Sequence, residues 1–386
     1  MHALTYSASP GTYILAGSAD RSIRLYNPQP STAIHPESSS NSNSITGRAA
    51  STAGAVPEGR LIQTYAAHGY EVLSLCVSRS NARFASAGGD RLAFLWDVST
   101  AQTIRRLGGG SGTSGHAARI NCVAFAGTGA GDDGADESLL VTGSLDASVR
   151  VWDLRSGGGG GGKPVQVLQE ARDSVTSVCI PEAGHEIVAG SVDGRVRAYD
   201  VRTGRCTTDV VGPPVTSLAP TRDGRALLVG ALDSRLRLLD RDSGALLRAY
   251  AHPGFRNDGL RVQSVLGGDD RWVVAGDEMT APSEGSNTSG GGGDPATPTP
   301  TPTPTPDGRL WAWDVLTGEV VARVRVPWGP PGHGARRKRV VGRDGKEKER
   351  ANVLSCLAWR DGGHGDQFCA GGTSGVVTVF GHHRAD

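Results

Sequence analysis

Short segments in which apolar and polar positions alternate recur along the chain. In TGSLDASVRVWD (142–153), Val149 and Val151 fall on one side and Arg150 on the other, which is the pattern of a half-buried β-strand. Small residues before Asp146 predict a second strand, and the aspartate marks a tight turn, so the segment predicts a β-hairpin. Six further segments share this pattern: AGSADRSIRLYN (16–27), SAGGDRLAFLWD (86–97), AGSVDGRVRAYD (189–200), VGALDSRLRLLD (229–240), PDGRLWAWD (306–314) and AGGTSGVVTVFG (370–381).

A fixed offset relates the seven hairpins, because in each one the turn residue lies six positions before a large apolar residue. Stretches such as LSLCVS upstream and LIQTY downstream bring a unit to four strands. A sheet of this size cannot bury both faces alone, so we expect the units to stack around an axis as the blades of a ring. The turn residues are Asp20, Asp90, Asp146, Asp193, Asp233, Asp307 and Ser374, and their apolar partners are Tyr26, Trp96, Trp152, Tyr199, Leu239, Trp313 and Phe380.

The sequence therefore predicts an all-β fold, a seven-bladed β-propeller that occupies residues 1–386 as a single domain. The first three strands of the blades are expected at about 3–27, 72–97, 119–153, 175–200, 215–240, 261–314 and 353–380.

The hairpins resemble the WD-repeat family of β-propellers. Trp96-Asp97, Trp152-Asp153 and Trp313-Asp314 match its Trp-Asp pair, Gly115-His116 matches its Gly-His, and Ala67-His68 is a variant of the latter. The resemblance implies a buried, hydrogen-bonded tetrad of a His, a Ser or Thr, the turn Asp and the Trp. The residues concerned are His68, Ser86, Asp90 and Trp96 in blade two and His116, Thr142, Asp146 and Trp152 in blade three.

Blades four and five depart from this tetrad. Ala189 and Val229 replace the hydroxyl, and Tyr199 and Leu239 replace the tryptophan. A lost hydrogen bond costs only ~0.5–1.5 kcal/mol net, so we expect apolar packing to hold these two blades. Sets of Ser, His and Asp also resemble a catalytic triad, but their recurrence between sheets favours the satisfaction of buried polar groups.

Six inserts lengthen the repeat. Successive turn residues lie 40 to 74 residues apart, against ~40–45 for such repeats, and the extra residues are rich in Gly, Ser, Pro or charge, so we expect flexible loops. Strand order directs 107–117, 279–306 and 327–351 to the face on which first strands begin, here called the top face. The inserts are 28–59, 107–117, 126–137, 156–163, 279–306 and 327–351.

Two inserts carry candidate chemistry. The Thr-Pro ladder from Thr297 to Pro306 fits either an extended spacer or a substrate of proline-directed kinases. The basic run 336–350 fits a solvated loop, a nuclear import signal or a contact to RNA phosphates. Aromatic residues do not alternate with these charges, which argues against a platform for stacked bases.

Closure of the ring is a separate question. The chain begins almost at once with the inner strand of blade one, and few residues follow Phe380. In the WD-repeat family the outer strand of the last blade comes from residues before blade one, so we expect this strand to be missing. Either the start is truncated or blade seven has three strands, and the resulting open edge would invite another chain.

Composition narrows the function. The 386 residues include 40 Lys plus Arg and 39 Asp plus Glu, and a net charge of +1 points to neither sequence-specific nucleic acid binding nor a membrane. No run of ~18 apolar residues or secretory pattern occurs, so we expect the protein in the nucleus and cytoplasm.

No Cys/His spacing suggests zinc, and four cysteines lie in apolar stretches, which favours burial: Cys76, Cys122, Cys179 and Cys356. We predict no enzymatic activity, cofactor or metal.

A narrower resemblance concerns function. The stretches AAHGYEVLSL (66–75), GGDRLAFLWDV (88–98), VQVLQEARDSVTSV (165–178), AGSVDGRVRAYDVRTG (189–204) and LDSRLRLLDRDSGALL (232–247) are similar to the mitogen-activated protein kinase organizer family of WD-repeat proteins. This resemblance implies a monomeric scaffold within larger complexes. Its expected partners are members of a kinase cascade in the cytoplasm and spliceosome components in the nucleus.

Candidate partner-binding residues lie just before first strands, around the top rim. Arg and Tyr are favoured interface anchors, and the charged pair Arg172-Asp173 is the leading candidate, although it also fits a local ion pair. An alternative function comes from Trp152-Asp153-Leu154-Arg155, which with Arg202 resembles the WDxR signature of substrate receptors of cullin-RING ubiquitin ligases. The rim candidates are Tyr70, Glu71, Arg119, Arg172, Asp173 and Arg256.

Overall fold

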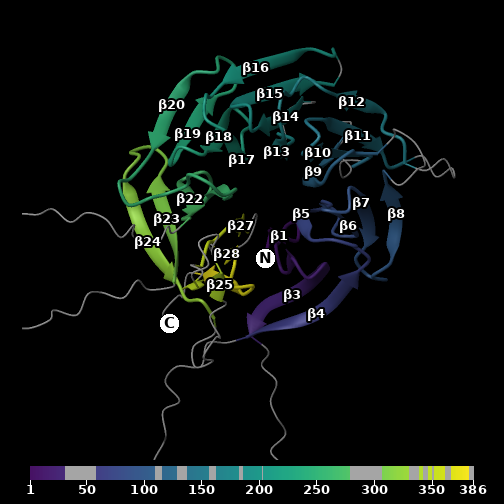
Figure 1. Cartoon of the computed structure of the whole chain (residues 1–386), viewed down its shortest axis with the longest axis horizontal. Coiled ribbons are helices and arrows are strands. Elements are labelled where there is room, and N and C mark those ends of the chain that lie inside the picture. Colours follow the sequence, from purple (N-terminus) through teal and green to yellow (C-terminus); the bar gives the residue numbers. More distant parts are fainter. Residues whose placement is uncertain are drawn as a thin grey trace, which may run out of the picture.

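Seven antiparallel sheets lie around a common axis in the computed structural model (Figure 1). The structure describes residues 1–30, 58–108, 115–127, 137–155, 162–181, 186–201, 203–278, 307–329, 339–341, 347–349, 352–360 and 367–381. Six sheets of the ring have four strands and one has three, and no helix occurs in these ranges. The predicted all-β, seven-bladed β-propeller is thereby confirmed.

Each blade runs from an innermost strand to an outermost strand in chain order, so the order within every sheet equals the order along the sequence. The strands of the first four blades are β1 (Ala3–Tyr6), β2 (Ile14–Gly17), β3 (Ser22–Pro30) and β4 (Gly59–Ala66); β5 (Val72–Val77), β6 (Arg83–Gly88), β7 (Ala93–Asp97) and β8 (Thr103–Leu107); β9 (Ile120–Ala126), β10 (Leu139–Ser144), β11 (Val149–Asp153) and β12 (Gln166–Leu168); β13 (Val175–Cys179), β14 (Glu186–Ser191), β15 (Arg195–Asp200) and β16 (Cys206–Val210). The remaining three blades are β17 (Val215–Pro220), β18 (Ala226–Ala231), β19 (Arg235–Asp240) and β20 (Leu246–Tyr250); β21 (Ser264–Gly267), β22 (Trp272–Gly276), β23 (Gly308–Asp314) and β24 (Val320–Val326); β27 (Cys356–Trp359), β28 (Gln367–Gly371) and β29 (Val377–Gly381).

The turn between the second and third strands accounts for the fixed offset in the sequence. The turn aspartate accepts a hydrogen bond from the backbone two residues later, as Asp146 does from the Ser148 N–H at 3.0 Å. The residue just after the turn residue has a positive φ, which closes a tight hairpin. It is glycine in only two of six blades: Arg21 (φ 70°), Arg91 (63°), Ala147 (60°), Gly194 (75°), Ser234 (58°) and Gly375 (78°).

Apolar side chains fill the spaces between neighbouring blades. Val151 of blade three shares a buried cluster with Val175 of blade four. The ring closes in the same way, because Leu4 of β1 clusters with Ala358 and Cys369 of blade seven. Full burial of one such valine or leucine contributes ~1.5–3 kcal/mol, so the interfaces between blades supply most of the stabilisation.

Blade seven has three strands, and no fourth strand pairs with β29 in the described ranges. The contrast with blade two is clear, because four of the five residues of β7 are buried while those of β29 are half-buried or exposed. Blade seven is thus three-stranded in the described ranges, as both alternatives for the closing strand predict.

The strand bounds differ from expectation in two blades. The first strands of blades six and seven begin at Ser264 and Cys356 rather than near 261 and 353. The residues before them bond to the neighbouring blade instead of their own sheet, since the Gln263 N–H donates to the Ser355 carbonyl at 3.1 Å.

Most residues of the six inserts lie outside the described ranges, including the whole Thr-Pro ladder, so the expected flexibility of these inserts stays a prediction. The insert 327–351 is an exception in part. It contains two paired strands, β25 (Arg339–Val341) and β26 (Glu347–Glu349). Backbone pairing there is local and needs no apolar core. In the described ranges, no helix has the length and apolar character that a bilayer crossing requires.

Candidate functional site

The structure brings the four tetrad residues of blade two together. Trp96 Nε1 donates to Ser86 Oγ at 2.8 Å, and Ser86 Oγ lies 2.7 Å from His68 Nε2. The other ring nitrogen, Nδ1, lies 2.7 Å from Asp90 Oδ2. Since the carboxylate accepts, Nδ1 carries the proton and Nε2 accepts from the serine hydroxyl. Ser86 is fully buried, so its hydroxyl cannot meet a substrate.

Blade three repeats this arrangement with Thr142 as the hydroxyl. Trp152 Nε1 donates to Thr142 Oγ1 at 2.9 Å, and His116 spans from Thr142 Oγ1 at 2.8 Å to Asp146 Oδ2 at 3.0 Å. Burial lowers the pKa of His116 despite the nearby Asp146 carboxylate. Burial raises the pKa of Asp146, but hydrogen bonds from His116 and Ser148 outweigh it and hold this pKa well below its usual value. The imidazole is therefore neutral and structural at pH 7.

The four substituted positions of blades four and five lie in buried apolar clusters, as expected: Ala189, Tyr199, Val229 and Leu239. Each of these blades also has an arginine–aspartate pair. In blade four, Arg197 Nη2 binds Asp193 Oδ2 at 2.6 Å, and Arg197 Nη1 donates to Ser191 Oγ at 3.0 Å. In blade five, Arg237 Nη1 donates to Asp233 Oδ1 at 3.1 Å. The arginine from the third strand thus pairs with the turn aspartate, the residue that a histidine contacts in blades two and three.

Blade one uses the same pair, because Arg24 Nη2 lies 2.7 Å from Asp20 Oδ2. The sequence carries a signal for all three pairs, an Asp-x-x-x-Arg spacing that starts at the turn residue. Blade six differs again, since Trp311 Nε1 donates to the buried Asp277 at 3.1 Å, and the His252 ring lies 4.6 Å from the Trp311 ring.

The top rim consists of the residues just before the first strands. Tyr70 is 61% exposed, ahead of β5. Arg119 is exposed ahead of β9, Arg256 is exposed in the connection before β21, and Glu71 is half-buried. The structure thus places these side chains on one face of the ring, at the starts of different blades.

The leading pair, Arg172 and Asp173, is exposed before β13. Within the described ranges the two residues form no ion pair with each other. The Arg172 N–H donates to Asp193 Oδ2 at 3.0 Å, and Asp173 Oδ1 accepts from the Ser174 N–H at 2.6 Å. The backbone is therefore fixed while the guanidinium of Arg172 extends into solvent, which suits an interface anchor.

Sequence reasoning missed a contact between blades far apart in the chain. Arg261, before β21, donates from Nη1 to the Asn121 carbonyl of β9 at 2.8 Å. Burial lowers the pKa of Arg261, and Arg119 adds to this effect by repulsion. The contact links blade six to blade three, and no local pattern in the sequence signals it.

The WDxR alternative is only partly described. Arg155 has a side chain that is 59% exposed, and its Nε lies 3.3 Å from Asp153 Oδ1 in the same motif. Arg202 lies outside the described residues. The guanidinium of Arg155 is accessible but already forms an ion pair with the Asp153 carboxylate.

Potential metal ligands and thiols are dispersed. No group of three His, Cys, Asp or Glu side chains in the described ranges could hold a metal ion. All six cysteines are free, with Cys122 and Cys356 buried and Cys76 and Cys179 half-buried. Burial raises the pKa of the Cys122 and Cys356 thiols to about 12, so they are uncharged.

Comparison with known proteins defines the class. The family model of the "WD domain, G-beta repeat" matches residues 59–97, 110–153 and 162–200. Each matched range begins in or near the outer strand of one blade and continues through the first three strands of the next, as 59–97 covers β4 to β7. The fold is therefore a β-propeller of WD40 repeats.

Among known proteins, the chain is 27% identical over 296 residues to the WD repeat domain-containing protein 83 homolog of Dictyostelium discoideum, covering 70% of this chain and 77% of that protein. It is 47% identical over 113 residues to human WD repeat domain-containing protein 83, covering 29% of this chain and 35% of that protein. A guanine nucleotide-binding protein subunit beta of Zea mays is 31% identical over 188 residues, covering 46% of this chain and 45% of that protein. The match to the human protein thus spans about a third of its length.

Proposed function

We propose that this propeller, which is similar to WD repeat domain-containing protein 83, is a non-catalytic scaffold that binds proteins through its top rim. The observation that carries the proposal is the exposure of Tyr70 and Arg172, with the Arg172 backbone held by its N–H bond to Asp193. A rigid aromatic or arginine anchor loses little conformational entropy on binding, and such residues dominate interface energies.

The use of the polar groups supports the same proposal. The Ser, Thr, His and Asp side chains that resemble a triad are buried between sheets and complete one another's hydrogen bonds. Their chemistry stabilises the fold, which leaves the exposed surface as the functional part of the molecule.

For the partners, we propose members of a mitogen-activated protein kinase cascade, components of the spliceosome, or both, with the protein present in nucleus and cytoplasm. Similarity to the organizer family supports this choice. A fluorescent fusion of the full chain tests the location, and its absence from one compartment rejects that branch.

Affinity purification of the tagged full chain with mass spectrometry tests the partners. We expect kinase-cascade or spliceosomal proteins to be enriched with the wild type and reduced at least tenfold with Tyr70→Ala/Arg172→Ala. The control is Leu316→Ala, because Leu316 is 80% exposed in the turn after β23, on the opposite face. Equal recovery of partner proteins with the double variant and with the control rejects the top rim as the binding surface. Recovery of a cullin-RING adaptor that is lost with Arg155→Ala supports the ligase-receptor alternative instead.

A further inference from the structure

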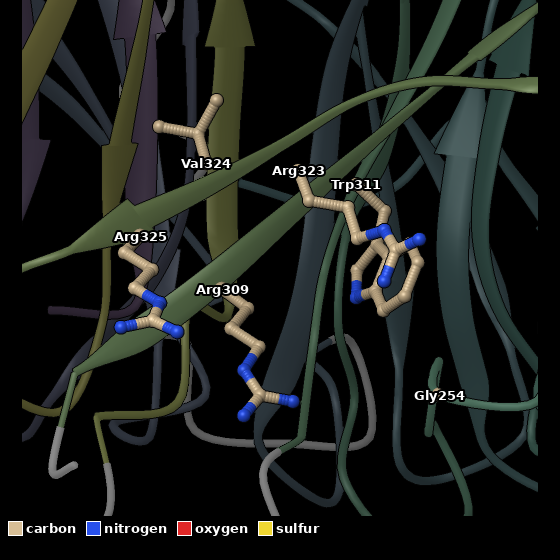
Figure 2. A pocket seen from close by; sticks show the side chains of 6 residues that line it. All are labelled: Gly254, Arg309, Trp311, Arg323, Val324 and Arg325. Atoms are coloured by element: carbon tan, nitrogen blue, oxygen red, sulfur yellow. The ribbon is translucent and has the colours of Figure 1, made fainter.

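Three arginine side chains gather on one face of blade six around a cavity of about 380 Å³ (Figure 2). Arg309 on β23 pairs directly with Arg325 on β24, and Arg323 lies two residues before Arg325 on the same face. Figure 2 shows Val324 on the opposite side of β24, as strand alternation requires. The register of the two strands therefore brings together charges that are up to sixteen positions apart in the sequence.

These guanidinium groups have no counter-charge in the described part of the chain. None of the three makes a hydrogen bond or ion pair there, and Arg323 only stacks over Trp311, 5.0 Å from the ring centroid. Like charges directly opposite each other destabilise a sheet. The strand registers of the described ranges contain no second pair of facing arginines. Arg197, for example, faces Thr208.

Other blades show how such charge is usually neutralised. Arg24, Arg197 and Arg237 each reach the turn aspartate four residues earlier. Trp311 takes the corresponding place in blade six, two residues before Trp313, and its Nε1 donates to Asp277. The Asp277 carboxylate is thus engaged by the indole, while the arginines line a cavity on the other side.

We infer that Arg309, Arg323 and Arg325 form a binding site for the phosphate group of a phosphorylated serine or threonine in a partner protein. Arginine forks match phosphate oxygens in pairs, and a phosphate brings a charge of about −1.5 to −2 at pH 7. Three converging guanidiniums can neutralise such a group and remove their mutual repulsion. The site contains none of the rim candidates, although Gly254 at its edge lies in the same connection as Arg256.

The surroundings favour a peptide over other phosphorylated molecules. β24 is the outermost strand of its sheet, so an extended segment can lie along its edge with one side chain in the cavity. Trp311 is only 2% exposed and offers no face for a nucleobase. The cluster is confined to two strands in a chain of net charge +1, which is too local for a membrane surface.

The test uses two seven-residue peptide libraries, one with phosphothreonine fixed at the centre and one with threonine there. We expect the wild-type chain to bind the phosphorylated library at least about tenfold more tightly by fluorescence anisotropy. Arg309→Gln and Arg325→Gln should each lose most of this preference. The matched control is Arg106→Gln in blade two, because Arg106 stacks over Phe94 at 5.6 Å in the same cross-strand position but has no facing arginine.

Thermal unfolding of each variant establishes that it remains folded. Equal binding of the two libraries by the wild type overturns the inference, and so does an equal loss with Arg106→Gln, which would indicate nonspecific charge. Binding of a single-stranded RNA oligonucleotide or of phosphatidylserine vesicles that requires Arg309 and Arg325, without binding of the phosphorylated library, also overturns it. The peptide measurement uses no partner protein. Failure of the proposed rim function therefore does not change its outcome.

Discussion

Burial should decide how strongly the arginine–aspartate pairs stabilise their blades, and the chain provides a matched comparison. Arg197–Asp193 and Arg24–Asp20 share the four-residue spacing, with N–O distances of 2.6 and 2.7 Å. The side chains of the first pair are 3% and 9% exposed, whereas those of the second are 33% and 48% exposed. The two pairs differ mainly in solvent access.

Arg197→Met removes the charge and keeps most of the apolar stem. The Asp193 carboxylate then lies buried but retains the Arg172 N–H at 3.0 Å and the Arg195 N–H at 3.2 Å. Breaking a buried pair costs ~3–5 kcal/mol when one ion is left alone, so with these remaining donors we expect a loss of about 2–3 kcal/mol. Arg24→Met should cost less than ~1 kcal/mol, because water replaces the arginine.

Urea unfolding followed by tryptophan fluorescence measures both free energies of unfolding. Burial raises the pKa of Asp193, but hydrogen bonds from Arg197 and Ser191 outweigh it and lower this pKa from 3.8 to about 2. Because the folded pKa lies below the unfolded one, the pair's stabilisation is complete above about pH 4 and lost as the pH falls through 2. The gap between wild type and Arg197→Met should narrow over that range. Equal losses for the two variants at pH 7 would refute the role of burial.

The blade-three tetrad and the cysteines allow three further tests. Trp152→Phe removes the bond to Thr142 and should cost about 1 kcal/mol in urea unfolding; an unchanged midpoint contradicts this. Since His116 has a lowered pKa when folded, the unfolded chain gains a proton first, and stability should fall as the pH drops below ~6.5. His116→Gln should weaken this dependence of the unfolding free energy on pH. An unchanged dependence assigns it to other groups. A maleimide should label the exposed Cys206 before the buried Cys122 in the native protein, as mass spectrometry of the peptides can establish; equal rates contradict the burial.

The sequence predicted the ring because two local rules repeat in it. Period-two alternation identifies strands such as Val149–Asp153, and the turn at Asp146 fixes their register whatever the loops contain. The tetrad partners could be assigned by resemblance, because the hydroxyl stands four residues before the turn aspartate in both blades and a histidine precedes the first strand.

The rest depends on contacts that local rules do not encode. The spacing of Asp193 and Arg197 is local, but the assembled blade is needed to show that this arginine pairs with the turn aspartate where blades two and three use a histidine. Arg309 faces Arg325 only through the register of two strands, one of which follows a long insert. Arg261 contacts Asn121 across 140 positions, where sequence separation carries no signal.

The offset between repeat and blade has a consequence for how such a chain can change. A repeat such as 59–97 contributes β4 to blade one and β5 to β7 to blade two. Excision or duplication of one repeat therefore alters two neighbouring blades together, and no single sheet is inherited as an autonomous module. Cooperative unfolding across adjacent blades is the expected thermodynamic signature of this overlap.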